Sequence, residues 1–315
     1  MPKTIITLPR KSTKEIRNKI KFFYTEKYFN KWMSKYLFKG LNYQQIHYFM
    51  KKMWAEGSIA VSEIKEADPV LAGLMEAGAI DMGTNNLILT PWAPANRFNI
   101  YDFPTHVRLI NVRGVKFITD KELELDKDAV IIYAQKNHKS IFSSIEFKIN
   151  EIVDIEMKMR VSRKAQSQPW MFTFSEEDKQ NAKILQEQMD NDEPYLFAPF
   201  NAPDKVKGIS SGAQYITDKQ EQDRQKVDND ILTMLGVNNV GIGEKKEHLI
   251  VDEVNANNDE IKQQALSIKN EIEEGWDRVN DVFGSKIELT DLNDEYMGEE
   301  QELEPKEEDG KNVSL

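Results

Sequence analysis

The chain of 315 residues is long enough to form a subunit with several subdomains, and 40% hydrophobic content suffices for a buried core. The absence of cysteine excludes disulfides, thiolate metal sites and cysteine nucleophiles. A net charge of -11 argues against a general nucleic-acid binder, because Lys and Arg neutralise phosphates in such proteins. The sequence lacks an apolar run of the roughly 18 residues that span a bilayer, and its start lacks a signal peptide's apolar core. We therefore expect a protein made in the cytosol.

Charge is distributed unevenly along the chain. Basic residues dominate Lys3 to Lys39, whereas Glu and Asp dominate everything after Glu271. The basic stretch also contains Tyr24, Tyr28 and Trp32. Two interpretations fit these aromatic residues equally: they stack on nucleic-acid bases beside phosphate-binding lysines, or they form a buried helix face with solvated lysines.

The N-terminal part of the sequence predicts helices followed by a small β subdomain. Apolar residues at three- and four-residue steps predict one helix or a helix pair over Lys14–Phe38, and shorter helices over Tyr43–Ala55 and Asp68–Ala77. Short apolar runs separated by Pro, Gly and Asn predict strands at Leu87–Leu89, Val107–Ile110, Val115–Ile118 and Val130–Tyr133. Residues 1–138 are thus expected to combine helices with a β-rich region.

Three long helices are predicted further along the chain. The first, over 139–166, carries an apolar stripe made of Ile141, Ile145, Ile149, Ile152, Ile155 and Met159. At about 1.5 Å per residue it would span roughly 40 Å. A Pro-rich segment, 167–215, separates it from a second helix over 216–236, which Gly236 caps.

The last part of the sequence predicts a loop, a third helix and an acidic end. Residues 237–251 are rich in Gly and Asn, and an apolar stripe predicts a helix over 252–284. Residues 285–315 are acidic and poor in apolar side chains, so we expect them to be loosely packed.

One catalytic motif is matched by its letters but not by its context. Gly208-Ile209-Ser210-Ser211-Gly212 fits the nucleophile elbow of α/β-hydrolases. That elbow needs an apolar strand before the serine, then an acid and a histidine after it, whereas polar residues precede Ser210 and the single downstream histidine, His248, stands in a Gly-rich loop. We therefore predict that the chain is not an enzyme and has no catalytic residue.

Metal and cofactor sites are not predicted either. The histidines are dispersed without metal-ligand spacing, at His47, His106, His138 and His248. Gly241-Ile242-Gly243 lacks the third glycine of a dinucleotide loop, and the sequence contains no G-K-[ST] motif. Asp291 to Glu295 begins like a calcium loop, but Tyr296 stands where that loop requires Gly.

Several short motifs lie close together in the second half of the chain. They are Asp218-Lys219, Leu235–Asn239, Glu244–Glu247, Val251–Val254 and Asn258–Glu260. Weaker matches lie at Asp128–Tyr133, Gln166–Pro169 and Pro194–Ala198. Together with the order of the segments, these motifs resemble the portal proteins (upper collar proteins, head-tail connectors) of small short-tailed phages with protein-primed DNA. The resemblance extends loosely from Asp68 to Phe283.

This resemblance implies an α+β, mainly α portal fold, whose subunits form a ring at one capsid vertex, a dodecamer in that family. Double-stranded DNA is packaged and ejected through the ring, to which the packaging motor and then the tail attach. The implied parts are the wing with the N-terminal helices (1–138), the first stem helix (139–166), the clip (167–215), the second stem helix (216–236), the channel loop (237–251), a tunnel or wing helix (252–284) and an acidic crown or tail (285–315).

By matching positions, the resemblance implies that Lys219, Lys245 and Lys246 face DNA in the channel. A further channel lysine that the family can carry falls near Ser210 here, so a full pair of lysine rings is not implied. An acidic pore with few lysines suits DNA that must slide, because tight phosphate binding would stop it. From their family position, the basic residues of the N-terminus would contact the motor, a packaging RNA or DNA: Lys3, Arg10, Lys11 and Lys14.

The implied partners are further copies of the chain, the major capsid and scaffolding proteins, the lower collar or tail protein, the packaging ATPase and the DNA. Whether a packaging RNA takes part stays open, and a membrane partner is not expected. The implied location is the capsid vertex of the virion, after synthesis in the host cytoplasm. The alternative is a cytosolic helical adaptor or scaffold that binds partner proteins through its long helices.

Overall fold

The structure is a computed structural model that describes residues 13–63, 85–110, 122–167, 170–173, 207–210, 216–239 and 251–292, and the side chains of 13–63, 85–110, 122–163, 216–239 and 258–292. The chain forms two compact units. The first contains Met1–Lys21 and Asn150–Asp228, and the second contains Phe22–Ile149 and Asn229–Leu315.

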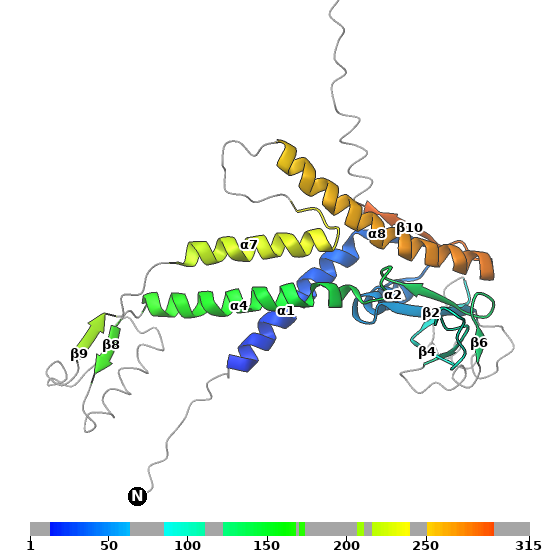
Figure 1. Cartoon of the computed structure of the whole chain (residues 1–315), viewed down its shortest axis with the longest axis horizontal. Coiled ribbons are helices and arrows are strands. Elements are labelled where there is room, and N and C mark those ends of the chain that lie inside the picture. Colours follow the sequence, from blue (N-terminus) through cyan, green and yellow to red (C-terminus); the bar gives the residue numbers. More distant parts are fainter. Residues whose placement is uncertain are drawn as a thin grey trace, which may run out of the picture. The chain divides into compact units, whose positions relative to one another are not determined.

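The elements follow one another in the order α1 (Thr13–Ser34), β1 (Tyr36–Lys39), α2 (Tyr43–Ala55), β2 (Ser58–Glu63), β3 (Leu87–Thr90), β4 (Trp92–Pro94), β5 (His106–Leu109), β6 (Leu123–Glu124), β7 (Val130–Tyr133), α4 (Ile141–Ser167), β8 (Trp170–Thr173), β9 (Lys207–Ser210), α7 (Thr217–Met234), α8 (Val251–Phe283) and β10 (Glu288–Asp291) (Figure 1). The three long helices predicted over 139–166, 216–236 and 252–284 are thus confirmed as α4, α7 and α8. Within the described residues, we find no helix that combines the length and apolar character required to cross a membrane.

Strand β7 is the centre of the second unit, and it is buried on both faces. On one face, Ile132 packs so closely against α8 that a Cβ atom at Gly275 would lie 2.6 Å from the Ile132 Cγ2 atom. On the other face, Ile131 packs with Val107 in a small apolar cluster. The apolar run Val130–Tyr133 that predicts this strand therefore reflects burial on two sides.

Two antiparallel three-stranded sheets flank this centre, with the strand orders β3-β2-β7 and β4-β5-β6. The Trp92 indole Nε1 atom donates a hydrogen bond of 3.1 Å to the Ser58 hydroxyl and so joins the two sheets. The strands predicted at Leu87–Leu89, Val107–Ile110 and Val130–Tyr133 are confirmed as β3, β5 and β7. Two other predictions, the strand Val115–Ile118 and the helix Asp68–Ala77, lie outside the described residues.

Helices α1 and α2 contact each other through aromatic side chains. Tyr24, Tyr28 and Trp32 are all buried, and the Trp32 ring centroid lies 5.9 Å from that of Trp54 in α2. Stacking on nucleic-acid bases is therefore the wrong interpretation of these residues, because their rings are already covered by the fold. The alternative, a buried helix face, is confirmed, although here its aromatic neighbour is α2.

The end of α1 differs from the sequence-based expectation. The helix predicted to reach Phe38 ends at Ser34, and Tyr36–Lys39 form β1, which pairs antiparallel with β10. Strand β10 belongs to the acidic stretch expected to be loosely packed, yet its Asp291 is 1% exposed. Helical periodicity cannot reveal a strand partner that lies this far away in the sequence.

A buried ion pair fixes this junction. The Lys35 ammonium lies 3.5 Å from the Asp291 carboxylate, and the two side chains are 3% and 2% exposed. The same ammonium donates a hydrogen bond of 3.3 Å to the carbonyl of Gly236, just after the end of α7. Lys35 therefore ties the end of α1 to both β10 and α7.

Replacing Lys35 by methionine should destabilise the protein strongly, because the Asp291 carboxylate would remain buried without this cation. We expect a loss of about 3–5 kcal/mol in the free energy of unfolding, most of which Lys35→Met combined with Asp291→Leu should recover. Urea denaturation of both single variants and the double variant measures this coupling. Strictly additive losses in the double variant would contradict the paired role of the two charges.

Candidate functional site

One face of α7 is exposed and polar over its first turns. Lys219, Gln222, Asp223 and Lys226 are exposed, and their spacing of three, one and three residues places them on a single helical stripe. Val227 lies on another face of the helix and is buried. Lys219, predicted to face DNA, is thus presented to solvent.

The charges on this stripe alternate in sign along the helix. Lys219 and Lys226 are positive and Asp223 stands between them. Neither lysine forms an ion pair with a residue in the described ranges, so both ammonium groups are available to an external anion. The carboxylate of Asp223 would oppose the approach of phosphate, so the stripe can hold a polyanion only weakly.

The other basic residue in this part of α7 has a structural role. The Arg224 guanidinium donates hydrogen bonds to the Glu221 carboxylate, including one of 3.0 Å from Nε, and lies 3.8 Å from Glu156 of α4. The hydrogen bond from Arg224 lowers the pKa of Glu221, and the positive charge of Arg224 adds to this effect. Arg224 therefore joins α7 to α4, whereas Lys219 and Lys226 remain available.

The lowered pKa of Glu221 makes this contact dependent on pH. A carboxyl group whose pKa is lower in the folded state stabilises the protein above its unfolded pKa, and that contribution disappears as the pH falls through the folded pKa. Glu221→Gln should therefore destabilise the protein at neutral pH, by less than about 1 kcal/mol because the pair is partly exposed. The difference from the unsubstituted protein should shrink between about pH 5 and 3. A difference that stays constant from neutral pH to acid would contradict this assignment.

The predicted site residues are only partly covered by the structure. Lys14 is exposed in the first turn of α1 and belongs to the same unit as Lys219. The other predicted residues lie outside the described ranges: Lys3, Arg10, Lys11, Lys245 and Lys246. Sequence reasoning missed Lys226, although its spacing of seven residues from Lys219 places both on one face of a helix.

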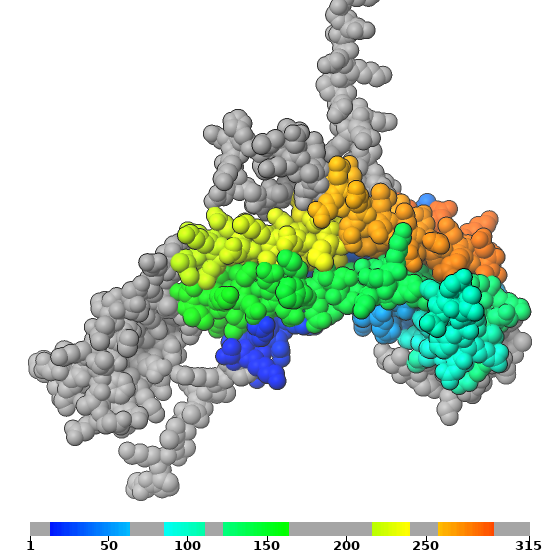
Figure 2. Space-filling view, viewed as in Figure 1, coloured from blue at the N-terminus to red at the C-terminus, as the bar shows by residue number. Residues whose placement is uncertain are grey.

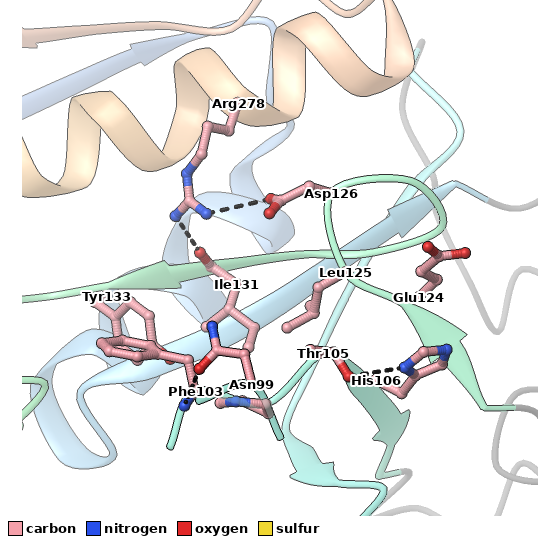
Figure 3. Close-up of a pocket in the computed structure, with 11 residues that line it drawn as sticks. Asn99, Phe103, Thr105, His106, Glu124, Leu125, Asp126, Ile131, Tyr133 and Arg278 are labelled. Carbon is pink, nitrogen blue, oxygen red and sulfur yellow. Dashed lines mark hydrogen bonds and ion pairs between the residues drawn. The ribbon is translucent and has the colours of Figure 1, made fainter. Parts of the chain in front are cut away.

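A second candidate site is a pocket of 430 Å³ in the second unit (Figure 3). The loop between β4 and β5 contributes Asn99 and Phe103, β7 contributes Tyr133, and α8 contributes Arg278. The Arg278 guanidinium donates a hydrogen bond of 2.7 Å to the Ile131 carbonyl and lies 3.3 Å from Asp126. Burial raises the pKa of the Tyr133 hydroxyl. Distant parts of the chain form this pocket, so local sequence patterns do not predict it.

The residues considered for catalysis or metal binding are arranged for neither among the described parts of the chain. His138 stacks on Tyr133 with ring centroids 3.8 Å apart, and His47 packs beside Tyr43. The described residues contain no group of three or more side chains placed to hold a metal ion. Ser210 lies in β9 opposite Trp170, in a two-stranded antiparallel ribbon, whereas the nucleophile elbow stands on the sheet of an α/β-hydrolase.

Comparison with known proteins covers nearly the whole chain. The model of the family Phage Connector (GP10) matches residues 5–294, which include every element from α1 to β10. Among solved structures, the chain is similar to one described as the portal and tail of native bacteriophage P68. The identity is 14% and the TM-score is 0.44, with 95% of this chain and 100% of that chain covered.

Proposed function

Because the chain belongs to the phage connector family, we propose that the exposed stripe of α7 faces the DNA that passes through its ring. As a member of this family, the chain is a structural portal subunit at one vertex of the capsid in the virion. Its ring admits and releases the double-stranded genome and attaches to the capsid and the tail. A dodecameric ring, made in the host cytoplasm, is part of the proposal.

The observation that carries this proposal is the pair of available lysines on one face of α7. A ring repeats each side chain around its axis, so Lys219 and Lys226 would form two belts of positive charge, with a belt of Asp223 between them. Contacts of this kind resist DNA movement without arresting it, because each phosphate contact is weak and reversible. The acidic character of the chain would keep the DNA centred by repulsion.

The remaining parts are proposed from the family order. Helices α4 and α7 would form the stem, residues 167–215 the clip that meets the packaging ATPase and later the tail, and residues 1–138 the wing beside the capsid and scaffolding proteins. Residues 237–251 would enter the channel, which gives Lys245 and Lys246 a second DNA-facing role. We also propose that the subunit has no catalytic activity, in keeping with the place of Ser210 in the β8–β9 ribbon.

Removing both lysines of the stripe should loosen the hold on packaged DNA. Rings with Lys219→Ala and Lys226→Ala should assemble and package DNA, but DNA should leak back more when the motor is stopped. Salt should affect this leak less than in unsubstituted rings, because each phosphate contact contributes about 0.9 to the slope of log affinity against log salt. DNA retention per particle, measured over a series of salt concentrations, tests the expectation.

Two variants serve as matched controls for this experiment. Asp223→Asn removes the opposing charge on the same stripe, so it should slow the leak and steepen its salt dependence. Lys51→Ala removes an exposed lysine of α2 and should change neither. Equal leakage and equal salt dependence in all the variants would contradict a role for this face of α7 in the channel.

The basic N-terminal residues are proposed to contact the packaging motor or a packaging RNA. Lys14 is exposed at the start of α1, so its charge is available to a partner. Deleting residues 1–14 should weaken motor or packaging-RNA binding and packaging while leaving ring mass unchanged, because the buried side chains of α1 begin at Tyr24. Co-sedimentation of rings with the motor measures binding, and light scattering measures ring mass. Normal packaging by truncated rings would exclude this role.

A further inference from the structure

The loop between β4 and β5 exposes an apolar patch. Ile100 and Tyr101 are 88% and 74% exposed, and Phe98 and Phe103 are about half exposed. We call these side chains, Phe98, Ile100, Tyr101 and Phe103, the apolar loop. Figure 2 shows the segment that contains them, in cyan, at the molecular surface. Single exposed apolar residues are ordinary in proteins, but a cluster in one short loop marks a surface that a partner covers.

The backbone of the apolar loop is fixed by Asn99. Its side-chain oxygen accepts hydrogen bonds from the amides of Tyr101 (2.9 Å) and Phe103 (3.1 Å). Its own amide donates to the Phe103 carbonyl at 2.9 Å, and its carbonyl accepts from the Asp102 amide at 3.1 Å. The loop is therefore held in one shape before any partner arrives, which reduces the entropy lost on binding.

The apolar loop and the pocket form one continuous surface. Phe103 and Asn99 belong to both, as Figure 3 shows. The Phe103 ring packs edge-on against His138, which in turn stacks on Tyr133 of the pocket wall. A partner that covers the loop therefore also covers the mouth of the pocket.

Charges around this surface are neutralised by their own neighbours. Arg97 and Arg108 lie 3.5 Å and 2.6 Å from the Glu122 carboxylate. The Lys127–Glu124 and Arg278–Asp126 pairs compensate the charges near the pocket in the same way. Nucleic acid requires cations that are available to phosphates, so this surface does not suit DNA or RNA. It suits an uncharged, apolar protein surface.

The next copy in the ring is not the occupant that this arrangement favours. Neighbours in a ring meet through two different patches of the subunit, one on each side. The projecting loop and the pocket beside it share Phe103 and therefore face the same way. The loop of one copy consequently cannot enter the pocket of the next, and both are left to a protein outside the ring.

We propose that the apolar loop and its pocket are the surface through which each subunit contacts the capsid shell protein, by uncharged apolar side chains. This inference rests on the proposed function. Apolar attraction is non-directional, so it does not require a fixed pairing of donors and acceptors. The same loop can therefore contact shell subunits at different rotational offsets, as a ring other than a five-fold or ten-fold one must in a five-fold vertex.

The absence of cysteine from the chain allows a direct test. Ile100→Cys gives every subunit a single thiol in the apolar loop, and Tyr43→Cys gives one at another highly exposed position, 80% exposed in α2. Alkylation by a maleimide is timed in the isolated ring and in the ring assembled into shells. We expect the Ile100→Cys thiol to react at least about tenfold more slowly in shells, and the Tyr43→Cys thiol to change less.

The other outcomes overturn the inference. A thiol already protected in the isolated ring would show that a neighbouring copy covers the loop. Equal alkylation of Ile100→Cys in the ring and in shells, or equal protection of both positions, would show that the shell does not contact the loop.

A second variant tests the same surface without labelling. Ile100→Ser with Tyr101→Ser should leave ring mass unchanged and reduce incorporation into shells by about tenfold or more. Normal incorporation, or loss of the ring itself, would overturn the inference. Failure of the unsubstituted chain to form rings would instead overturn the proposed function.

Discussion

The antiparallel contact between α4 and α7 decides which side chains of α7 remain available to a partner. In one unit Arg224 contacts Glu156, and in the other Asp230 lies 2.9 Å from Lys148, so residue numbers rise along one helix as they fall along the other. Ile231 lies one helical repeat beyond Arg224 and is buried. This use of Arg224 and Asp230 leaves the stripe with Lys219 and Lys226 exposed.

The composition of that stripe suits a surface past which a polyanion must move. Two lysines separated by an aspartate attract phosphate at two levels and repel it between them. A stripe of lysines alone would bind DNA more tightly, and a stripe of carboxylates alone would exclude it. The same separation of roles appears in the second unit, where the charges around the apolar loop are consumed by local ion pairs and the exposed surface is apolar.

Local periodicity predicted the helices well. The spacing of Ile141, Ile145 and Ile149 gave α4, and each of these side chains is buried. The run Val130–Tyr133 gave β7 because burial on both faces leaves an uninterrupted apolar signature. Lys219 was found through the family resemblance, and Lys226 follows from it by helical spacing once α7 is known.

Features that join distant segments could not be predicted in this way. Tyr36–Lys39 continue the apolar pattern of α1, and only pairing with Glu288–Asp291 makes them a strand. The pocket needs Phe103, Tyr133 and Arg278 together, which no spacing in the sequence indicates. The aromatic residues of α1 left two interpretations open, because an amphipathic aromatic face looks the same whether it packs on protein or on bases.

The measurement that tests the account most directly is a cryo-electron microscopy reconstruction of the assembled ring with DNA in its channel. The account predicts a closed ring in which Lys219, Asp223 and Lys226 of every subunit point toward the DNA density. A ring in which this stripe of α7 faces away from the channel, or a particle without a central channel, would contradict it.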